Sequence, residues 1–201
     1  MTVRRSLLAI LDQAPCYGYQ LRAEFERRTN GAWPVNIGQV YGTLDRLERS
    51  GHAQRGDPDA HGHVYWRITA AGRAELAAWW ATPTAHGRTF RDDMVMKVTL
   101  AATLPGVDAA AVIAAEVAAV GDRAAALRIA ADSAADLPAA LVLEARCVAA
   151  EAEHGWLESA AGRIARDPAG AVPLRTDRPR RGRPSGRAVA VTDRTAAEKP
   201  A

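Results

Sequence analysis

The chain contains little cysteine, which excludes several classes of protein. Only two of its 201 residues are cysteines, Cys16 and Cys147, and they lie far apart in the sequence. They cannot make the disulfide framework of a small secreted domain, and they lack the C-x-x-C spacing of redox and zinc sites. The cysteine content therefore predicts a reduced, cytoplasmic protein.

Long hydrophobic runs are also absent. No apolar stretch approaches the ~18 to 20 residues that are needed to cross a bilayer. The first five residues include a charged pair, but Asp12 and Gln13 interrupt the short apolar segment that follows. This pattern argues against a signal peptide. We therefore expect no membrane partner.

Motifs that carry enzyme chemistry are absent as well. The sequence has no G-x-S-x-G, H-E-x-x-H, P-loop or Rossmann fingerprint. Asp92 and Asp93 resemble paired catalytic carboxylates, but acidic residues are favoured at the start of a helix for electrostatic reasons alone. The histidines and Cys16 form no tight cluster with metal-ligand spacing. We expect a protein that is not an enzyme and that has no metal site and no cofactor.

Aromatic residues are scarce, at 5% of the chain, and the 48% of hydrophobic residues is rich in alanine. This composition predicts a mainly helical fold. The net charge of +3 is unevenly distributed, because residues 166–201 contain nine basic and four acidic residues and the rest of the chain is slightly acidic. The overall charge alone is therefore no sufficient reason to expect a nucleic-acid-binding protein.

The most informative segment runs from Trp33 to Leu76, and its first helix has two faces. Val40, Leu44 and Leu47 lie at i, i+4 and i+7, so they share one side of the helix and can be buried together. The opposite side carries Gly38, Gly42, Asp45, Arg46 and Arg49, with Gln39 beside them near the helix start. Each glycine lowers helix propensity by roughly 1 kcal/mol relative to alanine. That cost is explained if another surface, such as the floor of a DNA groove, must come close.

The elements that the sequence predicts before and after this helix follow the order of a known fold. Residues 3–11 and 18–28 predict two helices. Residues 52–56 and 63–68 predict two short strands around a turn rich in glycine, aspartate and proline. Thr69 is suited to cap the helix that follows. Three helices, a two-stranded hairpin and a fourth helix form the layout of a winged helix-turn-helix.

Four short stretches share their order and spacing with one protein family. They are Tyr17–Tyr19 before the second helix, Gly38–Tyr41 at the start of the third, Leu44–Gly51 with the pattern L-x-R-L-E-x-x-G, and Tyr65–Arg73 around the second strand. Over about residues 5–80 the chain resembles the PadR family of bacterial transcriptional regulators. It departs from the family at Gln39, Gly42 and Trp66, where many relatives have Thr, Pro and Tyr. These departures bear on base preference and not on the fold.

The second half of the sequence predicts more helices, over about 91–100, 109–134 and 139–165, with Pro138 separating the last two. Its Arg91-Asp92-Asp93 opening resembles the C-terminal helical domain of the same family, in which these helices make a dimer. Alanine-rich helices have thin apolar stripes, which bury little apolar surface within a single chain. This favours a dimer over a monomer in which these helices only cap the winged helix. The expected division is 1–83 for a winged helix DNA-binding domain, 89–165 for a helical dimerisation domain and 166–201 for a disordered basic tail.

The expected fold is thus mainly α, and these features favour a sequence-specific DNA-binding transcriptional regulator. It would act as a homodimer on a palindromic operator in double-stranded DNA, as a repressor that a small-molecule effector releases. Four tryptophans suggest a flat pocket for a small aromatic effector, although ordinary core and dimer packing explains them equally well. They are Trp33, Trp79, Trp80 and Trp156. The alternative function is a ligand-binding or protein-interaction module that keeps the winged fold without binding DNA.

The candidate DNA contacts lie on and before the third helix, in the wing and in the tail. They are Tyr19, Asn36, Gly38, Gln39, Tyr41, Gly42, Thr43, Arg46, Arg49, His61, His63, Arg181 and Arg183. Tyr41 is either a phosphate contact or a core aromatic with its hydroxyl in water. Arg46 and Arg49 either read a guanine edge or form a solvated face. The two histidines lie either beside the minor groove or in an exposed loop.

The tail contains Arg-Pro-Arg-Arg-Gly-Arg-Pro at residues 178–184, which resembles an AT-hook with its Arg-Gly-Arg-Pro core. Gly182 would let the chain lie flat on the groove floor, while Arg181 and Arg183 point along the narrow minor groove of A·T-rich DNA. Two simpler interpretations stay open, namely non-specific contact with phosphates and a solvated tail without a partner.

Overall fold

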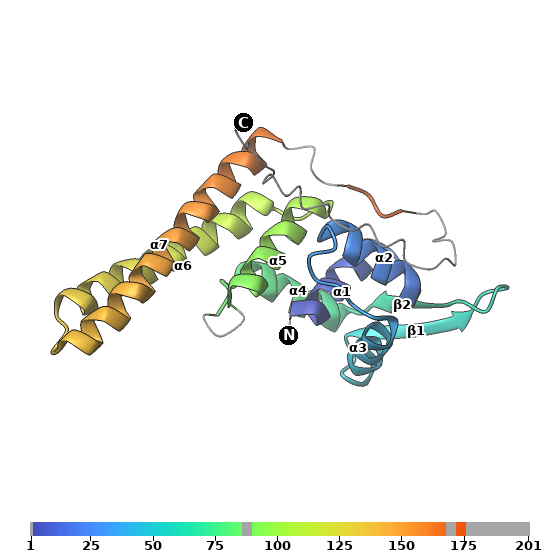
Figure 1. The fold of residues 1–201 in the computed structure, drawn as a ribbon. Coiled ribbons are helices and arrows are strands. Elements are labelled where there is room, and N and C mark those ends of the chain that lie inside the picture. The colour runs from blue at the N-terminus through green and yellow to red at the C-terminus, as the bar shows by residue number, and fades with distance from the viewer. Residues whose placement is uncertain (1, 86–89, 168–171, 176–201) are drawn as a thin grey trace, which may run out of the picture.

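The chain forms seven helices and one two-stranded sheet over the part that the computed structural model describes, residues 2–85, 90–167 and 172–175. In chain order these are α1 (Thr2–Leu11), α2 (Gly18–Arg28), α3 (Ile37–Arg49), β1 (Ala53–Pro58), β2 (Val64–Ile68), α4 (Ala70–Ala81), α5 (Phe90–Thr103), α6 (Ala109–Asp132) and α7 (Leu137–Arg166). This order confirms the expected mainly α fold with an N-terminal winged helix-turn-helix (Figure 1). Most of the basic tail lies outside the described residues.

The winged helix has a continuous core built from its helices and its sheet. Leu8 of α1, Phe25 of α2 and Leu44 of α3 are completely buried. Trp66 of β2 joins them, and its backbone pairs with that of Cys16 through two hydrogen bonds, Cys16 N to Trp66 O (3.1 Å) and Trp66 N to Cys16 O (2.9 Å). The turn before α2 is therefore fastened to the wing, and burial of these side chains fixes the position of α3.

The strands β1 and β2 are antiparallel, and their side chains alternate between the core and solvent. Ala53 pairs with Ile68, and both are buried, whereas Gln54 pairs with Arg67, and both are exposed. This alternation is typical of a hairpin with one face on a core. The register shifts once near the end of β1, and the hairpin then projects from the body of the winged helix (Figure 1).

The start of α4 lies directly against the chain that leaves α3. Thr69 caps α4 as expected, because its Oγ1 accepts a hydrogen bond from Gly72 N (3.1 Å) and also donates one to Gly51 O (2.6 Å). A Cβ atom at Gly72 would lie 2.2 Å from the carbonyl oxygen of His52. Glycine is therefore required at this position, because no side chain fits between the two segments.

The helix α5 contributes to two hydrophobic clusters. Its Met96 and Leu100 pack in the core of the winged helix, while Met94 and Val98 pack in a second cluster with Leu157 of α7. Because one helix takes part in both clusters, α5 joins the winged helix to the helices that follow. The expected domain boundary before α5 stays a prediction.

The helices α6 and α7 form a long antiparallel hairpin that projects away from the winged helix (Figure 1). The sequence predicts that Pro138 interrupts the chain between them, and this is wrong in detail. α7 begins at Leu137 with Pro138 in its first turn, and Asp136 caps the helix by accepting a hydrogen bond from Ala139 N (2.8 Å). Proline fits there because an N–H group in the first turn has no partner within the helix.

Candidate nucleic-acid interface

The start of α3 is closed by a reciprocal cap. Asn36 Oδ1 accepts a hydrogen bond from Gln39 N (2.8 Å), and Gln39 Oε1 accepts one from Asn36 N (3.0 Å). These bonds satisfy backbone N–H groups that a helix start leaves without partners. Both residues are also exposed, so they hold the helix in place and lie on the surface that a partner would meet.

The exposed face of α3 contains two glycines, of which Gly42 is not required by the packing of the described residues. On the opposite face of α3, Val40 and Leu44 are completely buried, as predicted. A Cβ atom at Gly42 would meet no atom of the described residues within 4 Å, and one at Gly38 would meet Asn36 Oδ1 at 3.3 Å. Each glycine lowers helix propensity by roughly 1 kcal/mol relative to alanine. At Gly42, the internal packing therefore offers no compensation for this loss of helix propensity.

Thr43 is buried rather than on the open face of α3, and its contact with DNA stays a prediction. It is 4% exposed, and its Oγ1 donates a hydrogen bond to Gln39 O (2.7 Å) and accepts one from Arg46 Nη2 (3.0 Å). Thr43 sits at the edge of the buried stripe and orients Arg46. Arg46 and Arg49 are both exposed, and Arg49 Nε donates a hydrogen bond to Asp45 O (3.3 Å).

Tyr41 of α3 lies against the first turn of α2. A Cβ atom at Gly18 would be 2.7 Å from Tyr41 Cζ and 2.9 Å from its hydroxyl oxygen, so glycine is what allows this close approach. Tyr41 is 37% exposed, and Tyr19, which follows Gly18, is 52% exposed. The two phenol groups therefore stand at the junction of α2 and α3 and are both accessible to a partner.

The turn of the wing is organised by Asp59. Its carboxylate accepts hydrogen bonds from His61 N (2.8 Å) and His63 N (2.9 Å). The bond from His63 N is the largest cause that holds the pKa of Asp59 below its ordinary value of 3.8. The ring of His63 packs on that of Tyr17, with centroids 4.7 Å apart, whereas His61 is exposed. His63 thus ties the wing to the turn before α2, and His61 is the more accessible of the two.

Two arginines that the sequence interpretation does not single out lie beside α3. Arg4 and Arg5 of α1 both pair with Glu75 of α4, and together with Arg46 they line a groove of about 470 Å³. Burial raises the pKa of Glu75, but the hydrogen bond and charge of Arg4 and the charges of His52 and Arg5 hold it below its ordinary value of 4.5. The surface next to Arg46 is therefore more basic than α3 alone suggests.

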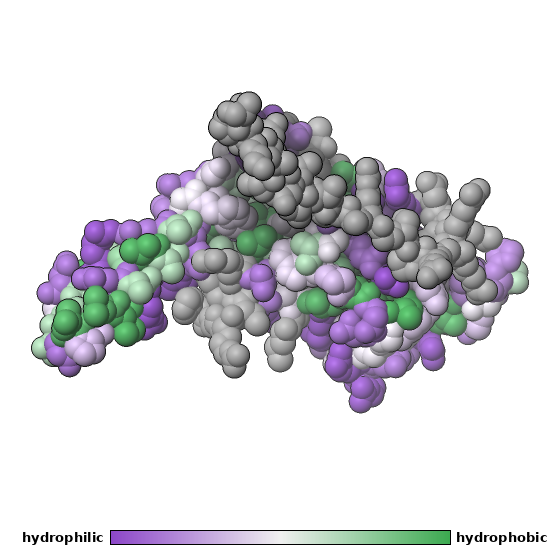
Figure 2. Space-filling view, in the orientation of Figure 1, coloured by the Kyte–Doolittle hydropathy of each residue, from purple (hydrophilic) through white to green (hydrophobic). Residues whose placement is uncertain are grey.

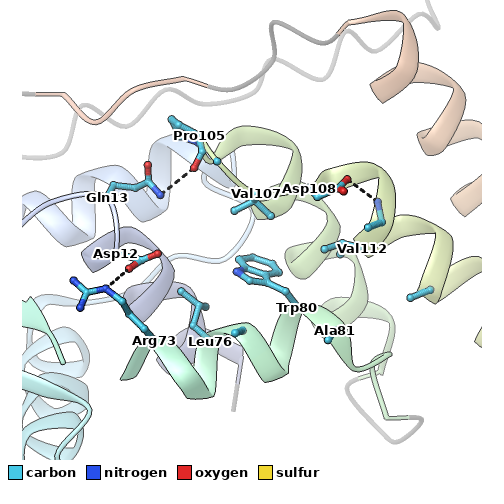
Figure 3. A pocket seen from close by; sticks show the side chains of 14 residues that line it. Asp12, Gln13, Arg73, Leu76, Trp80, Ala81, Pro105, Val107, Asp108 and Val112 are labelled. Carbon is cyan, nitrogen blue, oxygen red and sulfur yellow. Dashed lines mark hydrogen bonds and ion pairs between the residues drawn. The ribbon is translucent and has the colours of Figure 1, made fainter. Parts of the chain in front are cut away.

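A pocket of about 640 Å³ lies between the winged helix and the helices that follow (Figure 3). Trp80 of α4 lines one side of it, and Val107 and Val112 near the start of α6 line another. Arg73 Nε lies 3.0 Å from Asp12 Oδ1 at its edge. Aromatic and apolar walls with a few polar groups are typical of sites for small organic molecules.

The four tryptophans do not share one pocket. Trp79 and Trp80 lie against each other, with ring centroids 4.3 Å apart. Trp33 packs against the core of the winged helix, and Trp156 lines a separate cavity of about 350 Å³ on α7. Of the four, Trp80 lines the pocket of Figure 3, and Trp79 is buried beside it.

One face of α7 exposes apolar side chains. They are Leu137 (71% exposed), Leu141 (56%) and Val148 (65%). At about 100° per residue these three positions fall within about 40° of one another around the helix, in one stripe. Figure 2 shows hydrophobic residues gathered near the end of the hairpin that is far from the winged helix. An exposed apolar stripe of this kind marks a surface that contacts another molecule, and we call it the α7 stripe.

Three further expectations concern the tail, metals and membranes. Arg181 and Arg183 lie outside the described residues, so their contact with DNA stays a prediction. Across the described ranges, no group of three or more His, Cys, Asp or Glu side chains is placed to hold a metal ion. Among the helices from α1 to α7, none combines the length and the apolar character of a membrane span.

Several solved structures resemble the chain at low sequence identity. PadR of Bacillus subtilis in complex with operator DNA is 18% identical with a TM-score of 0.41, and the match covers 82% of this chain and 99% of that one. The virulence activator AphA of Vibrio cholerae is 20% identical with a TM-score of 0.35, covering 82% and 98%. A transcriptional regulator of Clostridium thermocellum is 22% identical with a TM-score of 0.37, covering 38% and 75%.

Comparison of sequences finds similarity to transcriptional regulators. Over 97 residues the chain is 33% identical to a probable transcriptional regulator of Mycobacterium tuberculosis. The matched region covers 45% of this chain and 50% of that protein. The chain thus spans about half the length of this curated relative. The segment from α1 to α4 matches the family described as Transcriptional regulator PadR-like. This match covers residues 7–78 of the chain.

Proposed function

We propose that this protein is a sequence-specific DNA-binding transcriptional regulator that inserts α3 into the major groove of its operator. The observation that carries this proposal is Gly42 on the exposed face of α3, where a Cβ atom would meet nothing within 4 Å. Without a side chain there, the helix backbone can approach the base edges closely. The family match of residues 7–78 supports the same function.

The side chains around α3 suit different parts of the duplex. Arg46 and Arg49 are long enough to reach base edges, where a bidentate contact with guanine contributes about 1–3 kcal/mol of discrimination. The hydroxyl groups of Tyr41 and Tyr19 are suited to phosphates, which fix the register without reading sequence. His61 on the wing is suited to the adjacent minor groove. Specificity therefore rests on α3, and the tyrosines and the wing align it.

The regulator acts as a homodimer that forms through α6 and α7. The α7 stripe is an exposed apolar surface, and a second copy of the chain brings an identical stripe to meet it. A single winged helix reads few base pairs, whereas a dimer reads two half-sites related by the same symmetry. A palindromic operator with half-sites about one or two helical turns apart follows from this arrangement.

The regulator is a repressor that a small aromatic effector releases from DNA. The pocket beside Trp80 has walls from both α4 and the start of α6, so a molecule bound there favours one packing of these elements over another. Titration with phenolic probes should quench tryptophan fluorescence in the wild type and much less in Trp80→Leu. The matched control is Trp156→Leu, which removes a tryptophan from a separate cavity and should leave the titration intact. Equal quenching in all three proteins would exclude this pocket.

The alternative is a ligand-binding or protein-interaction module that keeps the winged fold without binding DNA. Footprinting of the purified protein on the region upstream of its own gene separates the two functions. We expect two protected half-sites on that DNA, and reduced preference at one base position with Arg46→Ala. If neither this region nor sequences selected from a random pool are protected, the DNA-binding function is wrong and the alternative stands.

A further inference from the structure

Residues 172–175 form a short non-helical segment that lies along α2, and we call it the strap (Figure 1). Val172 N donates a hydrogen bond to Thr103 O (3.0 Å) at the end of α5. Arg28 Nη2, in the last turn of α2, donates one to Val172 O (2.7 Å). The strap therefore begins at the C-terminal end of α2, where its backbone is held from two helices.

The contacts of the strap continue toward the other end of α2. Arg27 Nη2 donates a hydrogen bond to Pro173 O (3.0 Å), and Arg175 N donates one to Glu24 Oε1 (3.1 Å). Gln20 Nε2, in the first turn of α2, donates one to Arg175 O (3.1 Å). The strap thus runs antiparallel to α2 and ends beside its first turn.

The strap supplies hydrogen-bond partners to two buried, charged side chains of α2. Glu24 is 2% exposed and Arg28 is 4% exposed, and Arg28 Nη2 lies 3.4 Å from Glu24 Oε2. Buried charged groups need several polar partners to offset the hydration that they give up. Backbone atoms of Val172 and Arg175 supply two of these partners, and Leu174 adds apolar contact with the core of the winged helix.

The end of the strap lies close to the candidate DNA contacts. The first turn of α2, which Gln20 shares with Gly18 and Tyr19, is where Tyr41 packs. We propose that the strap anchors the basic tail beside this turn, so that residues 178–184 contact the duplex next to the half-site that the same chain binds. This inference rests on the proposed function, because it assumes that α3 binds DNA.

The length of chain beyond the strap limits where the tail makes contact. Arg181 is six residues past Arg175, and six residues span at most about 20 Å. A tail free from residue 167 onward would reach roughly twice as far, and in any direction. The strap therefore restricts the tail to DNA close to that half-site, and the high effective concentration of the tail there strengthens binding.

The test compares two double variants that carry the same net charge. One of them disrupts the strap, and the other is its control. Val172→Pro with Arg175→Pro removes the two N–H groups that donate to Thr103 O and Glu24 Oε1, whereas Val172→Ala with Arg175→Ala keeps both. Each is made in the full chain together with Ser185→Cys, which carries an iron chelate that cleaves nearby DNA. The native thiols do not compete for the label, because both are buried and burial raises the pKa of Cys16 to about 12.

The expected results differ sharply between the two proteins. The alanine protein should cleave a single cluster of positions next to each half-site. The proline protein should keep the footprint over the half-sites, scatter its cleavage, and bind about tenfold more weakly at low salt. Deleting residues 176–201 should reduce the log–log salt slope by about 0.9 for each phosphate that the tail neutralises in the full chain. Identical cleavage by the two proteins, or an unchanged salt slope after deletion, would overturn the inference.

A second variant covers the case in which the proline protein fails to fold. Gln20→Ala removes the last bond of the strap, and it should broaden the cleavage pattern of the full chain. In the chain that lacks residues 176–201 it should leave operator affinity unchanged, which separates anchoring of the tail from direct contact between Gln20 and DNA. An effect of equal size in both chains would refute the anchoring. Failure of the wild type to footprint any DNA would refute the proposed function as well.

Discussion

Lys97 and Glu116 form an ion pair that is completely buried. Lys97 Nζ lies 2.8 Å from Glu116 Oε1, and both residues are 0% exposed. Lys97 Nζ also donates a hydrogen bond to Thr82 O (2.7 Å), and the Glu116 carboxylate accepts bonds from the N–H and the hydroxyl group of Thr84. The pair thus joins α5, α6 and the segment that follows α4.

We predict that Glu116→Leu lowers the free energy of unfolding by about 3–5 kcal/mol, because it leaves a buried ammonium group without its anion. Lys97→Met should cost less, since the carboxylate keeps the two donors of Thr84. The double variant should recover part of the loss. Urea unfolding followed by tryptophan fluorescence measures all three, and single variants as stable as the wild type would contradict the prediction.

Gly72→Ala should destabilise the winged helix, because its Cβ atom would lie 2.2 Å from the backbone oxygen of His52. Overpacking of this kind typically costs about 1–3 kcal/mol. The matched control is Gly42→Ala, whose Cβ atom has free space and whose helix propensity is better by roughly 1 kcal/mol. Thermal unfolding should shift down for the first variant and up for the second. Equal shifts would show that the contact at Gly72 is relaxed at little cost.

Gly42→Leu should abolish operator binding while the fold stays intact. Its Cβ atom meets nothing within 4 Å in the free protein, but the leucine side chain would stand between the helix backbone and the base edges. Circular dichroism checks the fold, and fluorescence anisotropy with labelled operator measures affinity. Gly42→Ala should weaken binding far less, because a methyl group extends much less far. Normal affinity in a folded Gly42→Leu protein would mean that α3 does not enter the groove in this way.

Local patterns in the sequence predict the parts of the fold whose side chains repeat with a period. The spacing of Val40, Leu44 and Leu47 identifies the buried face of α3, and the residue type and position of Thr69 identify it as a cap. Such signals lie within one element and follow from helix geometry. They also lead to the glycines of α3.

Contacts between distant segments cannot be predicted in the same way. Lys97 and Glu116 belong to residue types that are almost always at the surface, and their pairing depends on how α5 meets α6. The strap is held mostly through backbone atoms, which leave no pattern in the sequence. The burial of Thr43 could not be predicted either, because this residue lies only one position from the open face of α3, at the boundary where burial depends on neighbouring helices.

Leu141→Lys should dissociate the proposed dimer, because it places a charge within the α7 stripe. Val142→Lys is the matched control, since Val142 is the next residue, is 59% exposed, and points about 100° away around the helix. Sedimentation at several concentrations should show monomers for Leu141→Lys and dimers for Val142→Lys and the wild type. If both variants or neither dissociate, the stripe is not the interface.

The pH dependence of stability should include a contribution from Glu75. Its pKa is below the ordinary value of 4.5 in the folded protein, so the unfolded chain binds the proton more tightly. The stabilisation is therefore present above the ordinary pKa and is lost as the pH falls through the folded pKa. Glu75→Gln should show a smaller loss of stability than the wild type between about pH 5 and about pH 3. Urea unfolding at several pH values measures both profiles, and parallel profiles for the two proteins would contradict the prediction.

The α6–α7 hairpin also has a mechanical consequence. α7 contains 30 residues, so at about 1.5 Å per residue it is about 45 Å long. A rotation of only about 6° at the base of such an arm displaces its tip by about 5 Å, nearly one turn of helix. Leu137 and Leu141 lie at that tip. In the proposed dimer, in which two such hairpins are joined, a small rotation of the hairpin near α5 would therefore change the distance between the two copies of α3.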